Sequence, residues 1–281
     1  MQKHIQAAHW ELTLPGGWGH ETYFARGEER VCFVKLGAQI PRYQVLAALG
    51  LTPPVWADGK LEDGTSILVQ PLVEGHSPSR ADFRIHLERI ATILARVHDS
   101  PALKQLLPEP ASRLHRDAGM EALADIRRRW ERHRAQVPEV AGFVDESLDQ
   151  LARELQGFTG NALAASHNDI CNGNWLVSSD GPIYLIDLES MSMEDPAVDA
   201  GALLWWYYPP DLRPRFLDIL GHANDEDFQR RMRVRMAMHC LHITLPREQG
   251  FDEFDPASYA EALTDFRAIL AGEENPQGYE D

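Results

Sequence analysis

One segment, residues 167–189, constrains the fold of this chain more than any other. It reads HNDICNGNWLVSSDGPIYLIDLE. Two β-prone runs, WLV and IYLI, are joined by the turn SSDG, and this pattern predicts a β-hairpin. The outer ends of the hairpin carry the polar side chains His167, Asp169, Asn174, Asp187 and Glu189. Because a hairpin brings its outer ends together, we expect a cluster of carboxylates and amides there.

The chain before residue 71 is rich in strand signals. Short β-prone runs alternate with Gly-rich or Asp-Gly turns in HWELTL, HETYFAR, RVCFVKL and VWADGKLEDGTSILVQPLVEG, and we predict five strands. A short helix is predicted over residues 41–49, with Pro41 in its first turn. These elements make a small β-rich lobe, with a boundary near residues 71–75.

Helical patterns dominate after this boundary. In residues 81–99 the apolar side chains recur every three or four positions, which is one face of a helix, and Ser79 is its predicted N-cap. Further helices are predicted over residues 118–134, 140–156, 197–207, 212–221, 225–245 and 257–271. The expected fold class is therefore α+β: a small antiparallel N-lobe, residues 1–73, and a larger, mainly helical C-lobe, residues 74–281.

The charge balance limits the classes of partner. The chain has 281 residues, with 43 acidic side chains against 27 Lys and Arg and a net charge of −16. Such a balance disfavours nucleic acid, whose phosphates need a basic footprint, and suits a cationic small molecule. Three scattered cysteines, Cys32, Cys171 and Cys240, form no CxxC pair, so we expect a reduced, cytoplasmic compartment. No apolar run is long enough to cross a membrane, and the sequence leaves the oligomeric state open.

The polar cluster has the composition of a phosphoryl-transfer site. Amide and carboxylate oxygens, such as those of Asn174 and Asp187, suit a hard cation such as Mg²⁺. Asp169 would remain free to orient and deprotonate a hydroxyl. A strand lysine, such as Lys35, could hold nucleotide phosphates, and the Gly-rich turn GGWG at residues 16–19 could lie over them.

Taken together, HNDICNGN and LIDLE resemble the catalytic signature of the aminoglycoside phosphotransferase and choline kinase superfamily. These are small-molecule kinases with a two-lobed, protein-kinase-like fold. The resemblance extends over nearly the whole chain. LPGGWGHETYFA resembles the Gly-rich loop, VCFVKL the lysine strand, ILVQPLVEG the hinge, and MEDPAVDAGALL the segment after the metal-binding Asp.

The resemblance implies a role for each matching residue and two cofactors, ATP and Mg²⁺. Asp169 would be the catalytic base, and Asn174 and Asp187 would bind the metal. Nucleotide contacts would come from Lys35, Gly16, Gly17, Gly19, and the backbone of Gln70 and Leu72. His167 and Asp199 would support the catalytic loop. Glu189 would contact metal or acceptor, and it is similar to the acid of the choline kinase and thiamine kinase branches.

One position departs from the family pattern. Relatives carry a Glu on the first helix that pairs with the strand lysine, whereas this chain has Arg42 near that place and no acidic residue between Glu29 and Asp58. Lys35 therefore needs another partner, either Gln39, Gln44 or a residue distant in sequence.

The leading functional hypothesis is an ATP-dependent phosphotransferase acting on a hydroxyl of a small, cationic molecule, either a choline-like amino alcohol or an aminoglycoside-type antibiotic. A catalytically weak or inactive nucleotide-binding protein is the alternative, and a protein-directed kinase is a third. The aromatic run Trp205–Tyr208 has two interpretations. On a helix, at most two of its rings share a face; the others either fill the core or hold a cationic amine by cation–π contact.

Overall fold

The computed structural model describes residues 10–14, 22–28, 30–246 and 254–280, and the chain divides into two compact units. The first comprises Met1–Ser79, Ser100–Leu107 and Cys171–Met191; the second comprises Arg80–Asp99, Pro108–Ile170 and Ser192–Asp281. The units interleave along the chain, so the predicted 1–73 and 74–281 lobes stay a prediction. The hairpin belongs to the first unit, whereas the residues just before it belong to the second.

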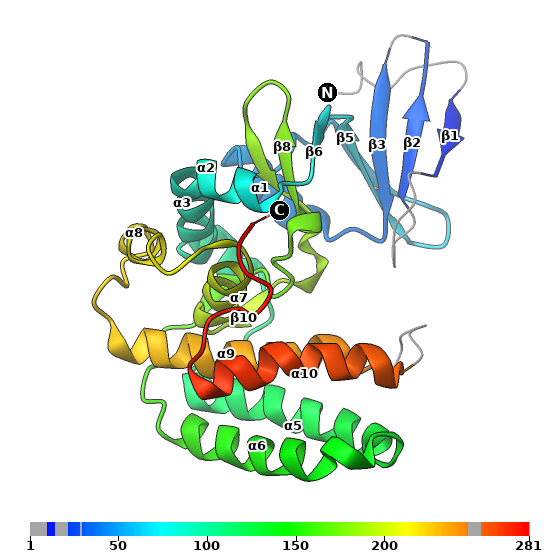
Figure 1. Cartoon of the computed structure of the whole chain (residues 1–281). Helices are drawn as coiled ribbons and strands as arrows, with labels where there is room; N and C mark the ends of the chain where they lie inside the picture. Colours follow the sequence, from blue (N-terminus) through cyan, green and yellow to red (C-terminus); the bar gives the residue numbers. More distant parts are fainter. Residues whose placement is uncertain (1–9, 15–21, 29, 247–253, 281) are drawn as a thin grey trace. The chain divides into compact units, whose positions relative to one another are not determined.

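The first unit is built on an antiparallel five-stranded sheet of order β1-β2-β3-β5-β4 (Figure 1). Its strands are β1 (Glu11–Thr13), β2 (Thr22–Arg26), β3 (Val31–Leu36), β4 (Ala57–Lys60) and β5 (Ser66–Pro71). Branched and aromatic side chains favour these strands. One face buries Ala25, Cys32 and Val69, with Trp10 and Trp56 packed against them. The five strands predicted from the sequence are thus confirmed.

Two helices belong to the same unit. Helix α1 (Ile40–Ala48) has its proline in the first turn, as predicted, and buries Tyr43 and Leu46. Helix α4 (Pro101–Leu106) was not predicted, because six residues are too few for a clear apolar period. Its N-cap is Ser100, whose side chain accepts a hydrogen bond from the Leu103 amide.

The predicted hairpin is present. Strands β8 (Trp175–Ser178) and β9 (Ile183–Leu185) pair antiparallel, and β6 (Gly75–His76) adds a third strand beside β8. The turn is closed by Gly181, whose φ of 99° is accessible to glycine at little cost. The Leu185 amide donates to the carbonyl of Leu51, 2.8 Å away, just beyond α1. This bond ties the hairpin to the residues that follow α1.

The second unit is mainly helical. Its helices are α2 (Arg80–Ile85), α3 (Leu87–His98), α5 (His115–His133), α6 (Pro138–Gln156), α7 (Ala197–Tyr207), α8 (Arg213–Ile219), α9 (Glu226–Thr244) and α10 (Pro256–Ala271). Strands β7 (Ala164–Ser166) and β10 (Ser192–Glu194) form a small antiparallel ladder. Helices α5 and α6 lie side by side, as do α9 and α10 (Figure 1). The α+β fold class, with an antiparallel sheet first and a helical majority after it, is confirmed.

One predicted helix is two. Residues 81–99 were expected to form a single helix, but α2 ends at Ile85 and α3 begins at Leu87. The residue between them, His86, has φ −102° and ψ 18°, outside the helical range. The backbone bonds from His86 to Asp82 and from Ile90 to His86 persist, so the apolar face continues through the bend. Periodicity detects that face but does not detect the local change of dihedral angle.

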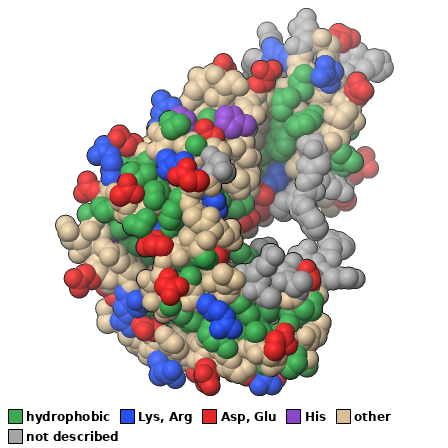
Figure 2. Space-filling model, viewed as in Figure 1, with side chains coloured by type: hydrophobic (Ala, Val, Ile, Leu, Met, Phe, Trp, Pro, Cys, Tyr) green, Lys and Arg blue, Asp and Glu red, His purple; other side chains and the backbone are tan. Residues whose placement is uncertain are grey.

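The visible surface carries charges of both signs. Figure 2 shows acidic and basic side chains dispersed among one another. Several are paired on the second unit, including Arg134 with Asp145 at 2.6 Å and Arg127 with Asp149 at 2.7 Å. In the described part of the chain, none of the helices has the length and apolar character needed to cross a membrane.

Candidate phosphotransfer site

The ends of the β8–β9 hairpin bring Asn174 and Asp187 together. Asn174 ends a short 3₁₀ turn, η3 (Asn172–Asn174), and Asp187 precedes another, η4 (Leu188–Ser190). The Ile186 amide donates to the Asn174 carbonyl at 2.9 Å, so the two positions are fixed beside each other. Asp187 has φ 58°, a left-handed conformation that is costly for a non-glycine residue. The two side chains offer an amide and a carboxylate oxygen, a donor set that fits Mg²⁺.

Lys35 reaches the same hairpin from strand β3. Its side chain is 5% exposed, and its Nζ lies 2.6 Å from Asp187 Oδ1 and 2.5 Å from Glu189 Oε2. It also lies 3.2 Å from the hydroxyl of Tyr43. Of the partners considered from the sequence, the distant residue is the right one; Gln44 instead bonds Asp58. A buried ammonium is stable only when paired, and two carboxylates supply that pairing.

Helix α1 holds the segment that carries Glu189. Arg42 Nη1 donates to the carbonyls of Leu188 and Glu189 at 2.8 and 2.9 Å. The Tyr43 hydroxyl donates to the Glu189 carboxylate, at 3.0 Å from Oε2, and accepts from the Leu188 amide. Sequence reasoning missed Tyr43, and the only signal for it was its place beside Arg42 on a helix without acids. Both residues act on the segment just after Asp187.

Burial shifts the proton affinities at this cluster. Burial raises the pKa of Glu189, and the neighbouring Asp187 adds to the rise, while Lys35 offsets part of it. Burial and the Glu189 carboxylate also raise the pKa of Tyr43 well above its ordinary value. Tyr43 is therefore a neutral hydroxyl at physiological pH, able to donate to Glu189.

In the second unit, the loop after β7 is held by Asp199 at the start of α7. Asp199 is fully buried and accepts from the backbone amides of His167 and Asn168 at 2.8 and 2.9 Å. Its Oδ2 lies 2.9 Å from His98 Nε2. Burial alone raises the pKa of Asp199, but the hydrogen bonds from His98 and from the His167 amide outweigh it, so this pKa lies below its ordinary value.

The same loop presents Asp169. The Asp169 amide donates to Nδ1 of His167 at 3.3 Å, and His167 is fully buried. Asn168 has φ 66° and donates its side-chain amide to Ser192 Oγ at 2.9 Å. The loop is thus braced just before Asp169, which is itself only half-buried. The supporting roles expected of His167 and Asp199 stay a prediction.

The remaining residues predicted to contact the nucleotide lie on β5, directly after it, or outside the described residues. Gly16, Gly17 and Gly19 lie outside the described residues. Gln70 is buried on β5, and its side chain donates to the Pro53 carbonyl at 2.6 Å. The Leu72 amide already donates to the Val31 carbonyl at 3.2 Å. A purine bonded to that amide would have to displace this contact, so the hinge roles stay a prediction.

A small hollow in the second unit lies beside the loop that carries Asp169. It has a volume of about 140 Å³. Its polar lining consists of Asn168, Glu194, Arg235, His239 and His242. Arg235 and Glu194 form an ion pair at 2.9 Å. The hollow therefore contains a carboxylate, a guanidinium and two imidazoles, and Asn168 in its lining directly precedes Asp169 in the sequence.

The aromatic run belongs largely to the core. Trp205 and Tyr208 are buried, and Tyr207 stacks on Phe83 with ring centroids 4.0 Å apart. Trp206 is half-buried; it meets His239 edge-on and donates to Asp265 at 3.4 Å. Packing thus accounts for most of the run.

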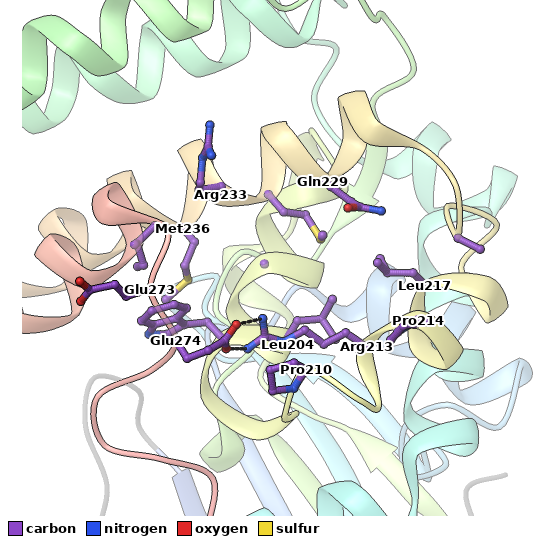
Figure 3. A pocket seen from close by; sticks show the side chains of 16 residues that line it. Leu204, Pro210, Arg213, Pro214, Leu217, Gln229, Arg233, Met236, Glu273 and Glu274 are labelled. Carbon is purple, nitrogen blue, oxygen red and sulfur yellow. Dashed lines mark hydrogen bonds and ion pairs between the residues drawn. The ribbon is translucent and has the colours of Figure 1, made fainter.

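A larger pocket, of about 400 Å³, lies among α7, α8, α9 and the end of α10 (Figure 3). Leu204, Leu217 and Met236 form part of its apolar wall, and Arg213 pairs with Glu274 at 2.6 Å on its edge. Its lining includes none of the residues predicted for phosphotransfer.

An antiparallel sheet carrying a buried lysine, and a hairpin carrying an amide–carboxylate pair, define the class of protein-kinase-like phosphotransferases. The chain matches the phosphotransferase enzyme family over residues 12–235, and it belongs to that family. The resemblance stated from the motifs is confirmed.

Solved structures agree on the fold. APH(2″)-IIIa bound to GDP and kanamycin superposes with a TM-score of 0.63 at 17% identity, covering 96% of this chain and 95% of the other. The choline kinase LicA from Streptococcus pneumoniae gives 0.60 at 19% identity, covering 95% and 96%. Spectinomycin phosphotransferase in complex with ADP and spectinomycin gives 0.57 at 14% identity, covering 95% and 90%.

Proposed function

We propose that the protein is a Mg²⁺-dependent kinase that transfers the γ-phosphoryl group of ATP to a hydroxyl of a small molecule. One observation carries the proposal: Lys35 Nζ lies 2.6 Å from Asp187, although 152 positions separate them in the chain. A phosphate-binding cation and a metal-ligand pair are thereby gathered in one unit. Positioning and charge neutralisation supply most of the catalysis in phosphoryl transfer.

Each residue has one task in this reaction. Asn174 and Asp187 would hold Mg²⁺, which neutralises charge developing on the phosphates. Lys35 would hold the α- and β-phosphates, with Gly16, Gly17 and Gly19 over them. Asp169 would orient the acceptor hydroxyl and take its proton as the acceptor oxygen bonds to phosphorus. The bond from that phosphorus to the leaving oxygen breaks, and ADP departs.

The acceptor proposed is small and cationic. The net charge of −16 favours a cation; the Glu194 carboxylate in the hollow beside Asn168 is already paired with Arg235. The structural neighbours include proteins bound to kanamycin and to spectinomycin, and a choline kinase. A choline-like amino alcohol and an aminoglycoside-type antibiotic are therefore the two acceptor classes to test.

The test is an ATP-consumption screen over amino alcohols, aminoglycosides, thiamine and sugars, with Asp187→Ala as the inactive comparison. We expect turnover with one acceptor class and loss of that turnover in the variant. Nucleotide binding without turnover of any acceptor would instead favour an inactive nucleotide-binding protein. The inactive alternative was suggested by the absence of an acidic residue on α1 that could pair with Lys35. Glu189 supports the active alternative, because its carboxylate pairs with Lys35.

A further inference from the structure

The first helix of this chain carries a base where its relatives carry an acid, yet Lys35 is fully paired. There is no acidic residue between Glu29 and Asp58, and Arg42 on α1 points its guanidinium at backbone carbonyls of the η4 turn. The carboxylates at Lys35 come instead from the hairpin, at Asp187 and Glu189.

We propose that Glu189 is the positioning partner of Lys35, and that Arg42 and Tyr43 fix it in place. The carboxylate that pairs with Lys35 is thus supplied by Glu189, two residues after Asp187, the proposed metal ligand. Helix α1 supplies Arg42 and Tyr43, which orient Glu189. This inference rests on the proposed function and assigns Glu189 a role other than metal ligand or acceptor contact.

Glu189 is better placed for this role than Asp187. Its side chain is 14% exposed, against 36% for Asp187. The Tyr43 hydroxyl contacts both Glu189 oxygens, at 3.1 and 3.0 Å, and Lys35 contacts Oε2. Arg42 holds the carbonyl of the same residue. Glu189 is therefore held through its side chain and its backbone.

The proposed role of Asp187 also requires a second acid. A carboxylate that binds Mg²⁺, or that a phosphate displaces from the lysine, no longer neutralises that lysine fully. Lys35 is 4% exposed, so it cannot rely on water for compensation. In the nucleotide complex, with or without metal, phosphates could replace the Asp187 contact at Lys35, and Glu189 would then keep Lys35 extended toward the hairpin.

The experiment measures the Kd of ADP by calorimetric titration, with and without Mg²⁺, in four proteins. They are the unmodified chain, Glu189→Gln, Lys35→Met and the double variant. Glu189→Gln keeps the size of the side chain and removes its charge, and we expect metal-free ADP binding to weaken roughly tenfold. If Glu189 acts through Lys35, adding Glu189→Gln to Lys35→Met should change the Kd less than twofold.

The Mg²⁺ dependence separates this role from metal ligation. For a positioning residue, the ratio of the Kd values with and without Mg²⁺ stays the same in Glu189→Gln as in the unmodified chain. A collapse of that ratio would show that Glu189 ligates the metal and would overturn the inference. Full additivity of the Glu189→Gln and Lys35→Met losses would overturn it as well, because the two residues would then act independently.

Conservative and control variants complete the test. Glu62→Gln removes an exposed acid from the turn between β4 and β5 and should leave ADP binding unchanged. Arg42→Ala should weaken ADP binding by several-fold while Arg26→Ala, an exposed arginine on β2, does not. Equal effects of the two arginine variants would contradict the role of Arg42. If the unmodified protein binds no ADP under either condition, the proposed function itself fails; additive losses in a protein that binds ADP overturn only the inference.

Discussion

Lys35 dictates much of the chemistry around it because it is a buried charge. An ammonium removed from water must be paired, and an incomplete pairing costs several kcal/mol. Lys35 has two carboxylates at 2.5 and 2.6 Å. In the proposed reaction, one of them is given up to the metal and a phosphate oxygen takes its place. The site can therefore exchange one anion for another without leaving Lys35 unpaired.

Asp169 is the residue with the sharpest kinetic prediction. Asp169→Asn keeps the size of the side chain and an acceptor oxygen but removes the charge that takes the proton. General-base help contributes about 10²–10⁴-fold in rate, so kcat should fall by about that factor. The Kd for nucleotide should change little, because Lys35, Asn174 and Asp187 remain. A loss confined to kcat marks an interaction made only in the transition state.

The measurement is kcat, both KM values and the nucleotide Kd, with Asp180→Asn as the matched control. Asp180 is exposed in the turn between β8 and β9, so its amide variant should behave as the unmodified protein. Near-normal kcat in Asp169→Asn, or loss of nucleotide binding with kcat preserved, would remove Asp169 from the role of base.

At the scale of elements, the loop that carries Asp169 depends on Asp199 at the start of α7. Asp199→Asn replaces an acceptor of several hydrogen bonds by a group that is partly a donor. The buried amide of His167 or the half-buried amide of Asn168 then loses its partner, at a cost of about 1–3 kcal/mol. Because the Asp199 pKa is lowered in the folded state, its contribution to stability is fully present above the unfolded pKa and is lost as pH falls through the folded value.

Urea unfolding at pH 7 and below about pH 4 checks this, since the ordinary Asp pKa lies near 3.9. The stability gap between the unmodified chain and Asp199→Asn should be wide at pH 7 and should narrow in acid. A gap that is independent of pH would show that the Asp199 charge does not contribute.

Replacing either of two helix-interior glycines by alanine should change the free energy of unfolding in opposite directions. A Cβ on Gly119 of α5 would lie 2.4 Å from Leu155 of α6, which is fully buried and cannot swing away. Gly119→Ala should therefore destabilise the protein by about 1–3 kcal/mol through overpacking. Gly142 of α6 has no neighbour within 4 Å of its Cβ position, so Gly142→Ala should stabilise by about 0.5–1 kcal/mol. Denaturant unfolding of both variants provides the comparison, and equal signs would contradict the packing argument.

The elements also show what sequence patterns can predict. The apolar faces of α5 and α6 and the β8–β9 hairpin were predicted because each repeats a period or a turn signal. The ladder of β7 with β10 was missed, because three-residue strands carry too little pattern. The pairing of Lys35 with Glu189 spans 154 positions; the sequence showed that a partner was needed, but identifying it required the fold. Tyr43 was missed for the same reason, since its hydroxyl bonds Lys35 on β3 and the η4 turn after Asp187.

On the scale of the whole molecule, the charge opposes the proposed nucleotide. A net charge of −16 repels a polyphosphate at long range, although salt screens this beyond about 8 Å at physiological ionic strength. Binding must therefore depend on local cations: Lys35 from the protein and Mg²⁺ from solution. The same net charge favours the approach of a cationic acceptor.

This dependence on a local cation leads to the final prediction, on the thermal stability of the chain. A ligand that binds only the folded state stabilises it by about 2.7 kcal/mol at a hundred times its Kd, which raises the melting temperature of a chain of this size by on the order of 5 °C. We expect such a rise with ADP plus Mg²⁺ and a clearly smaller one with ADP alone. In Asp187→Ala the increment due to Mg²⁺ should vanish while a rise with metal-free ADP persists, because Lys35 remains paired with Glu189. Asp180→Asn should match the unmodified protein. If Mg²⁺ still adds as much to the melting temperature of Asp187→Ala as to that of the unmodified protein, the metal binds elsewhere.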